Sequence, residues 1–466
     1  MNAMHRDLIR LASRIEAEDA PRAAQDPARQ HWHLQPPTGW LNDPNGLCVY
    51  KGQYHAFYQY APFAADGSGA KFWGHAVSTD LVHWQPLPVM LCPDQPYDIH
   101  GVYSGSALVE GEEMYLYYTG NVKYSGDYDY ITAGRGHNVC LAVSRDGVTM
   151  AEKTCLLYNV DYPAGLTCHV RDPKVFAHEG RYYMVLGART LDDVGEVLVW
   201  ESTDRRSWTH INTLKTPASF GYMWECPDLF EVDGQWFLAV SPQGLTQQGD
   251  CFQNIYASGY FLVEGDWRTG GTLGKFVEFD KGFDYYAPQS FFDPLKGRRV
   301  QIGWMGMPDA EYTNPLTYGW QHCLTAPCVL TVRDGRLLRT PAPELEAIRA
   351  DADATAAGEH SLPFCFDWEL TCTEGFCLEL RGSLRLTFAE GTFTMELTDS
   401  AAGFGRSVRR AEVEALHSVR VLGDASSVEV FLNGGETVLT TRYYPAPDCR
   451  TARMQGAQGT LYALRV

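Results

Sequence analysis

The chain is short of positive charge. It has 38 Lys and Arg residues against 57 Asp and Glu residues, a formal net charge of −19 at pH 7. Nucleic acids and anionic membrane surfaces attract basic proteins, so this balance argues against both as partners. Long hydrophobic runs are missing too, since no stretch approaches the roughly 18 apolar residues that a membrane-spanning helix needs. We therefore expect no nucleic-acid partner and no membrane partner.

Metal-binding patterns are also missing. The chain has 13 Cys and 14 His, but it contains no CxxC pair and no Cys/His spacing typical of a zinc site. No P-loop, GxGxxG, HExxH or GxSxG motif is present. The sequence therefore predicts no metal and no cofactor. Scattered cysteines of odd number favour reduced thiols and a cytoplasmic location.

The first twenty residues lack the continuous apolar run of a signal peptide. Leu8, Leu11 and Ile15 recur at helical spacing among charged residues. This spacing predicts a short amphipathic helix.

What the chain does contain is a repeat. Five segments open with small or turn residues and continue as two short strands, and they begin at Asp43, Ser104, Asp172, Cys226 and Ala287. The starts lie about 55 to 70 residues apart, which fits a four-stranded blade with long connections. The five copies predict a five-bladed β-propeller over residues 30–342.

A different pattern follows the fifth copy. Residues 343–358 are rich in Ala, Glu and Asp and predict a linker helix. From residue 359 to 466 the alternation of a strand returns without the blade pattern, which predicts an antiparallel β-sandwich. The expected fold is all-β: an N-terminal helical extension over 1–29, the propeller, the linker helix and the sandwich.

Three carboxylates occupy equivalent places in the repeat, near the start of a copy: Asp43, Asp172 and Glu225. The first strand of each propeller blade lines the central channel, so we expect all three at one mouth of it. Taken singly, the two aspartates can be explained by Asx-Pro turns and the glutamate by a strand end that faces solvent. Taken together, they favour a site, because two carboxyl groups facing one sugar ring are the usual equipment for breaking a glycosidic bond.

A retaining glycosidase needs a nucleophilic carboxylate and an acid/base about 5 Å apart. Asp43 is the better candidate nucleophile, because amides of its turn can hydrogen-bond an ionised carboxylate. The apolar neighbours of Glu225 suit a proton donor. Asp172 would bind ring hydroxyls, with Arg171 pairing nearby. The residues alone leave a second assignment open, in which Asp172 is the nucleophile.

Polar and aromatic residues near these motifs fit a sugar pocket. They are Gln59, Trp73, Tyr103 and Ser104. Each has an alternative role, because buried aromatics usually serve packing and Gln59 could cap a strand.

At these residues the chain resembles glycoside hydrolase family 32, the invertases, sucrose-6-phosphate hydrolases and fructanases. The resemblance runs from His33 to the C-terminus. The motifs that carry it are Trp40 to Gly46, Phe57 to Tyr60, Trp73 to Ala76, Asp80 to Trp84, Gly101 to Ser106, Arg171 to Phe176, Glu225 to Asp228, Tyr286 to Gln289 and Val428 to Asn433.

The resemblance implies a five-bladed propeller with a sandwich, and retaining hydrolysis of β-D-fructofuranosides. It places Asp43 on the nucleophile, Glu225 on the acid/base and Asp172 on the transition-state stabiliser. The substrate-binding positions that it implies are Trp40, Leu41, Asn42, Gln59, Trp73, Tyr103, Ser104, Arg171, Tyr286 and Trp304.

The expected partner is a small sugar, sucrose or sucrose 6-phosphate. A fructan hydrolase, a fructosyltransferase and a non-catalytic sugar-binding propeller are the alternatives, and a homodimer through the second domain is open. A phosphate preference would need cations at the pocket rim. Lys71, Lys123 and Arg135 are the candidates, and the alternative is that they are solvated loop charges.

Overall fold

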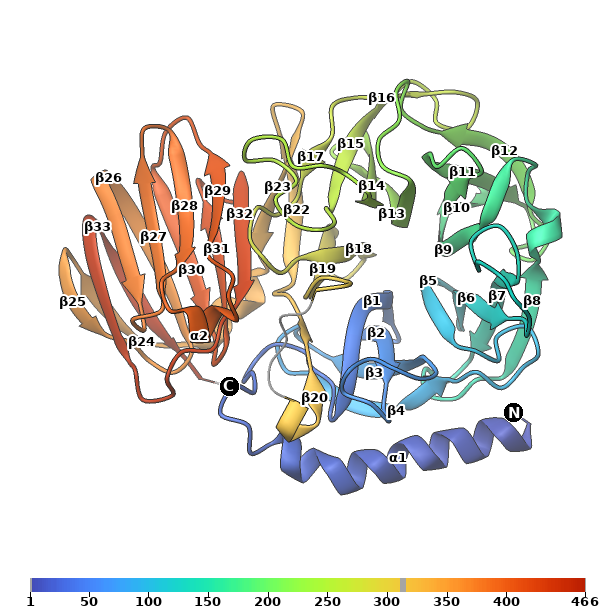
Figure 1. The fold of residues 1–466 in the computed structure, drawn as a ribbon, viewed down its shortest axis with the longest axis horizontal. Helices are drawn as coiled ribbons and strands as arrows, with labels where there is room; N and C mark the ends of the chain where they lie inside the picture. Colours follow the sequence, from blue (N-terminus) through green and yellow to red (C-terminus); the bar gives the residue numbers. More distant parts are fainter. Residues whose placement is uncertain (1, 311–315, 466) are drawn as a thin grey trace.

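The computed structural model describes residues 2–310 and 316–465. Five small antiparallel sheets surround a central channel, and a two-layered β-domain lies beside the ring (Figure 1). The predicted all-β fold, a five-bladed propeller followed by a sandwich and preceded by a short helix, is confirmed. Among the described residues, no helix is both long enough and apolar enough to cross a membrane.

Blades one to three each contain four strands that pair in chain order. Their strands are β1 (Gly39–Tyr50), β2 (Gln53–Ala61), β3 (Phe72–Ser78), β4 (Gln85–Leu91), β5 (Val102–Glu110), β6 (Glu113–Lys123), β7 (Arg135–Ser144), β8 (Glu152–Leu157), β9 (Leu166–His178), β10 (Arg181–Thr190), β11 (Gly195–Ser202) and β12 (Thr209–Leu214). A 3-10 turn, η1 (Asn159–Asp161), connects blades two and three.

Blades four and five have the same plan with additional short strands. Blade four contains β13 (Met223–Val232), β14 (Gln235–Gln243), β15 (Gly259–Glu264), β16 (Thr272–Leu273) and β17 (Val277–Glu278). Blade five contains β18 (Tyr286–Asp293), β19 (Arg298–Met305), β21 (Cys323–Leu324), β22 (Cys328–Arg333) and β23 (Arg336–Pro341). The first strands of the blades, β1, β5, β9, β13 and β18, face the channel (Figure 1).

The first strand of each blade is interrupted by a β-bulge. In β9, β13 and β18 the bulge holds Asp172, Cys226 or Ala287 with a following proline, and these three residues have φ of 65°, 47° and 47°. Proline has no N–H to give to the ladder, so a bulge is one of the few places in a sheet that accept it. Bulges bend a strand and re-aim its side chains. The repeated turn residues of the sequence therefore mark the point where each blade turns side chains to the channel mouth.

The ring closes where blade five meets blade one. The two-residue strand β20 (Trp320–Gln321), preceded by η2 (Leu316–Tyr318), pairs in parallel with the start of β1. Helix α1 (Ala3–Ala23) runs along the outside of blade one (Figure 1). The predicted helix exists, but its apolar face was predicted partly wrongly: His5, Ala12 and Ala23 are buried, whereas Leu11 is 45% exposed.

Residues 343–358 do not form the expected linker helix. Only η3 (Pro343–Ile348) is helical, as a 3-10 turn, and the chain continues directly as β24 (Arg349–Thr355) and then β25 (Gly358–Ser361). Both strands pair with β33 (Thr451–Leu464). This pairing overrides the helix propensity of an Ala- and Glu-rich segment, which is a weak preference.

The sandwich has two layers that share two long strands. The first half of β26 (Phe366–Leu380) pairs with β30 (Ser418–Gly423), and its second half pairs with β27 (Leu384–Ala389). β33 pairs with both halves of β26. The other strands are β28 (Thr392–Leu397) and β29 (Val408–Glu412) in one layer and β31 (Ser427–Leu432) and β32 (Thr437–Arg442) in the other, with a single helical turn, α2 (Ser400–Gly403), between β28 and β29.

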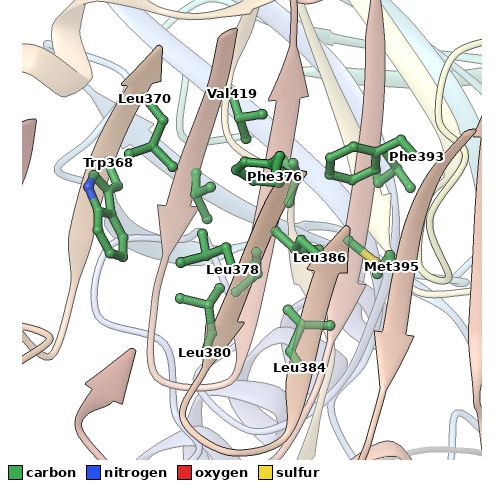
Figure 2. Packing of buried hydrophobic residues seen from close by; sticks show 14 of the residues in the cluster. Trp368, Leu370, Phe376, Leu378, Leu380, Leu384, Leu386, Phe393, Met395 and Val419 are labelled. Atoms are coloured by element: carbon green, nitrogen blue, oxygen red, sulfur yellow. The ribbon is translucent and has the colours of Figure 1, made fainter. Parts of the chain in front are cut away.

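Apolar side chains from both layers meet in one core. Figure 2 shows leucines of β26 and β27 facing aromatic and methionine side chains of neighbouring strands. The labelled members are Trp368, Leu370, Phe376, Leu378, Leu380, Leu384, Leu386, Phe393, Met395 and Val419. Because every second residue of these strands points inward, the alternation in the sequence produces the layer.

Candidate active site

The three predicted carboxylates open into a single cavity of about 640 Å³ at the mouth of the channel. Eleven of the predicted site residues line it: Trp40, Asn42, Asp43, Gln59, Tyr103, Ser104, Arg171, Asp172, Glu225, Tyr286 and Trp304. A larger cavity of about 1140 Å³ lies between blade four and the sandwich and contains none of these residues.

Asp43 is held at the mouth by blade two. The hydroxyl of Ser104 donates to Asp43 Oδ2 at 2.5 Å, and Gln59 Nε2 donates to that hydroxyl at 2.8 Å. Asn42 Nδ2 donates to Asp43 Oδ1 at 3.2 Å. Burial raises the pKa of Asp43, the hydrogen bond from Ser104 opposes this, and the charge of Glu225 adds to it. The carboxylate is therefore fixed in orientation and poorly solvated.

Asp172 is the most buried of the three acids, with 6% of its surface exposed. The backbone N–H of Cys226 donates to its Oδ2 at 2.9 Å, and the Cys226 thiol lies 3.6 Å from both Asp172 Oδ2 and Asp43 Oδ2. Burial raises the pKa of Asp172 to about 7; Arg171 works against this, whereas the charges of Glu225 and Asp43 add to it. The bulge of blade four thus joins the two aspartates.

Glu225 accepts hydrogen bonds from side chains of three blades. Arg171 Nη2 donates to Glu225 Oε1 at 2.6 Å, whereas its nearest approach to Asp172 is 3.9 Å. Tyr286 Oη and Gln243 Nε2 donate to Oε2 at 2.6 and 2.9 Å. Arg171 thus pairs near Asp172, but it donates hydrogen bonds across to Glu225.

Burial, together with the charge of Glu225, raises the pKa of Tyr286 well above its usual range. Tyr286 therefore stays an O–H donor. The indole of Trp224 packs against Phe261, on the opposite face of β13 from Glu225, because neighbouring residues of a strand alternate. Trp224 is thus not part of the surroundings of this carboxyl.

Two predicted substrate-binding residues lie behind the cavity wall. Leu41 is fully buried in the core of blades one and five, since it faces away from its neighbours Trp40 and Asn42. Trp73 is also fully buried, and its indole N–H donates to the carbonyl of Tyr103 at 3.0 Å. Their predicted place in the pocket is wrong for the side chains, and Trp73 supports the backbone that carries Tyr103.

An aromatic wall covers one side of the cavity. The rings of Trp40 and Trp304 meet edge-on at 6.0 Å, and Tyr286 meets Trp304 at 6.3 Å. The indole N–H of Trp40 donates to Asn42 Oδ1 at 2.9 Å, which orients the amide next to Asp43. Such rings suit the apolar face of a sugar, because they offer large, rigid contact area beside polar groups.

Several lining residues were not predicted as part of the site. Gln243 ends the second strand of blade four, just as Gln59 lies near the end of the second strand of blade one, so the repeat could have indicated it. His169 lies outside the cavity lining but accepts from Arg171 Nη1 at 2.7 Å, and burial lowers its pKa to about 3. Of the three cations predicted as candidates for the rim, Lys71 and Arg135 line the cavity, whereas Lys123 is exposed and is not among the lining residues.

The charge balance of the mouth is incomplete. Three carboxyl groups face one cavity, and Arg171 lies 2.6 Å from Glu225 and 3.9 Å from Asp172. Buried like charges at short range do not all ionise together. The group therefore keeps a proton at a pH at which isolated carboxyls have lost theirs. A shared proton among fixed carboxylates is what acid–base chemistry requires.

One group of described residues has the spacing of a metal site, and it lies elsewhere. His5 Nδ1 is 3.1 Å from Cys92 Sγ and 3.6 Å from Asp94 Oδ2. Asp94 is already paired with the ammonium group of Lys153, and its carbonyl accepts from Asn2 at 3.2 Å. These contacts fasten the start of α1 to the propeller.

Two family models match the chain. Residues 33–341 match the model described as the N-terminal domain of glycosyl hydrolases family 32, and residues 348–464 match its C-terminal model. The sucrose-6-phosphate hydrolase of Bacillus subtilis is 39% identical, covering 96% of this chain and 95% of that protein. The sucrose-6-phosphate hydrolase of Salmonella typhimurium is 38% identical, over 94% and 93%.

Solved structures agree with these matches. The sucrose-6-phosphate hydrolase of Lactobacillus gasseri superposes with a TM-score of 0.88 at 27% identity, covering 97% of this chain and 96% of that one. A variant of a β-fructofuranosidase of Bombyx mori in complex with sucrose superposes with a TM-score of 0.84 at 29% identity, over 100% and 99%.

Proposed function

The chain belongs to glycoside hydrolase family 32, and we propose that it hydrolyses the β-D-fructofuranosyl bond of sucrose and sucrose 6-phosphate with retention. One observation carries the proposal: acids from three different blades converge on one cavity at equivalent places in the repeat. The relatives named as sucrose-6-phosphate hydrolases and the structural relative with bound sucrose support the substrate class.

In the first step, an oxygen of Asp43 attacks the anomeric carbon of the fructosyl unit. The bond to the leaving-group oxygen breaks, and Glu225 gives that oxygen its proton. Water then attacks the same carbon, Glu225 takes the proton of the water, and Asp43 departs. The hydrogen bonds from Arg171 and Tyr286 support this assignment, because they fix the orientation of Glu225 in the cavity, which proton transfer requires.

We assign Asp172 to the charge that develops between these steps. The anomeric carbon of a ketose is fully substituted and readily forms an oxocarbenium-like state. A fixed carboxylate beside it stabilises positive charge in a poorly solvated cavity. Asp172 is suited to this role because the amide of Cys226 holds one of its oxygens.

The test measures fructose release by the purified protein and by Asp43→Asn and Glu225→Gln. Each variant should lose at least about 10³-fold in kcat, because one step of the mechanism loses its reacting group. Glu231→Gln is the matched control, since Glu231 lies on the same strand and is exposed. Full activity in either site variant would overturn the assignment, and an inactive wild-type protein would indicate a sugar-binding propeller.

A substrate whose leaving group needs no proton separates the two roles. With 4-nitrophenyl β-D-fructofuranoside, Glu225→Gln should still release nitrophenol in a first burst, because only its second step is slow. Asp43→Asn should show no burst. The reverse pattern would exchange the two roles.

We also propose a cytoplasmic location, supported by thirteen cysteines that are all free. For the assembly we propose a homodimer through the sandwich, which contributes no residue to the described cavity lining. Sedimentation equilibrium would test it, with a monomer mass as the contradicting result.

A further inference from the structure

Two cations beside the cavity face each other without a counter-ion. Lys123 ends β6 and Arg135 begins β7, and the two residues are directly opposite in the ladder. Like charges in this position are destabilising. In the parts of the chain that the structure describes, neither side chain forms an ion pair with an Asp or Glu, although the protein has 57 acidic residues.

The same strand places unsatisfied donors in the cavity. Arg135 and His137 are two residues apart on β7 and therefore share a face, and both line the cavity. The Nε of Arg135 is buried with no hydrogen-bond partner among the described residues. His137 is only 1% exposed, and both its ring nitrogens lack a partner in the same set. Leaving such groups unsatisfied costs free energy unless a ligand contacts them.

These groups are linked to the proposed proton donor Glu225 through Arg171. Arg171, which holds Glu225, also contacts His169, and the rings of His169 and His137 are 5.4 Å apart. A chain of side-chain contacts thus connects Glu225 through Arg171, His169 and His137 to the strand that carries Arg135. Burial lowers the pKa of His137 far below its usual range, and the charge of Arg171 is the next largest cause. Arg135 and Lys123 lower this pKa further, and no carboxylate of the described residues offsets their charge at His137.

We propose that Arg135 and Lys123, with His137, form a subsite for a phosphate monoester carried by the leaving-group sugar. The inference rests on the proposed function, and it names the residues that would separate sucrose 6-phosphate from sucrose. A guanidinium binds phosphate through two parallel hydrogen bonds, and an ammonium adds a point charge. A dianion would neutralise both cations and satisfy the free donors of Arg135 and His137. Because the protein has a net charge of −19, binding of a dianionic substrate requires a local group of cations.

The third candidate cation has a hydrogen-bond partner, whereas the ammonium group of Lys123 has only a ring contact among the described residues, with its Nζ 5.6 Å from the ring centroid of Tyr130. The ammonium group of Lys71 donates to the carbonyl of Gly67 and lies 5.6 Å from the ring centroid of Trp40. Burial lowers the pKa of Lys71 to about 8. Lys71 is therefore part of the wall near Asp43 and not of the phosphate subsite.

The experiment measures kcat/KM for sucrose and for sucrose 6-phosphate in parallel. The quantity compared between variants is kcat/KM for sucrose 6-phosphate divided by kcat/KM for sucrose. In Arg135→Gln the ratio should fall at least about 30-fold through KM, because a paired charge is lost. In Lys123→Gln it should fall several-fold, because this cation is exposed. Arg145→Gln is the matched control: Arg145 follows the other end of β7 and pairs with Glu113. Its ratio should stay within about twofold.

Free phosphate distinguishes a general anion site from a subsite for the substrate. Inorganic phosphate should inhibit sucrose hydrolysis competitively in the wild-type protein and more weakly in Arg135→Gln. An unchanged ratio in both Arg135→Gln and Lys123→Gln would overturn the inference, as would an equal loss on both substrates.

If the wild-type protein cleaves neither sugar, the proposed function fails while the subsite remains testable. Calorimetric titration with glucose 6-phosphate should then show binding to the wild-type protein and several-fold weaker binding to Lys123→Gln, a substitution at an exposed position. Equal binding, or none to the wild-type protein, would refute the subsite by itself.

Discussion

Buried acids gather in two regions of this molecule, the channel mouth and the seam between propeller and sandwich, and the two regions treat them differently. At the seam, His33 lies between Asp424 at 2.8 Å and Glu429 at 2.9 Å. Asp284 pairs with Arg406 at 2.6 Å. Each of these acids therefore has a buried cation beside it.

At the mouth, Asp172 and Glu225 share Arg171, and Asp43 has no ion pair among the described residues. Burial would lower the pKa of His33, but its bonds to Asp424 and Glu429 outweigh this and raise it. Burial would likewise raise the pKa of Asp424, yet the hydrogen bond from His33 helps to hold it at about 2. Asp172 has the opposite outcome, with a pKa near 7. At His33 and Arg406 the seam therefore uses its charges for orientation, whereas the mouth keeps uncompensated charge for chemistry.

The largest expected effect is at the seam. Asp424→Asn should lower the free energy of unfolding by about 3 kcal/mol, because it leaves the His33 cation half-paired in a buried place. Urea unfolding at pH 6 measures this. Asp351→Asn is the control, because Asp351 forms a surface pair with Arg465 in which both side chains are more than three-quarters exposed. A cost no larger than that of the control would remove the distinction between seam and surface.

The mouth should respond with the opposite sign. The pKa of Asp172 is raised to about 7 in the folded state. The free energy of unfolding therefore falls as the pH rises from the pKa of the unfolded chain to about 7, because the folded protein must give up a proton that it holds more tightly. Asp172→Asn should therefore raise the free energy of unfolding by about 2 kcal/mol at pH 8, and should change it little at about pH 3, where the wild-type carboxyl is mostly protonated in both states. Destabilisation at pH 8 would show that the mouth is neutralised as fully as the seam.

The smallest effect concerns the pH profile of catalysis. Because burial raises the pKa of both Asp43 and Asp172, the acid limb of kcat/KM should lie at least about one pH unit above the value of 3.9 for a free aspartate. Activity should fall as pH falls through this limb, since the nucleophile and the stabiliser must be ionised. A limb near pH 4 would indicate solvated carboxyls and would weaken the contrast between the regions.

The repeat explains why the fold could be predicted from sequence. Each blade starts with the same kind of turn residue, as at Asp172-Pro173 and Cys226-Pro227, because each first strand is bulged at the same point. The gathering of the three acids followed from that equivalence. Their roles remain a proposal.

What could not be predicted depends on contacts between blades. Arg171 donates hydrogen bonds to Glu225 and not to its chain neighbour Asp172, and His169 belongs to no motif. Leu41 was misplaced because a motif does not tell which face of a strand its members occupy. Residues 343–358 were misread because strand pairing with β33 outweighs local propensity.

The two-layered path of β33 has a consequence for synthesis of the chain. This strand supplies backbone partners to both layers, through β24, β25 and β26. As a ribosome delivers the protein, all strands of the ring have emerged before residue 342, but neither layer is complete until residue 464 is available. Until then the leucine-rich inner faces of the sandwich remain exposed, because β33 has not yet paired with them. Chaperone binding to the nascent chain should be greatest in this interval. A nascent chain arrested before Thr451 should consequently be far more sensitive to protease in its second half than in its first.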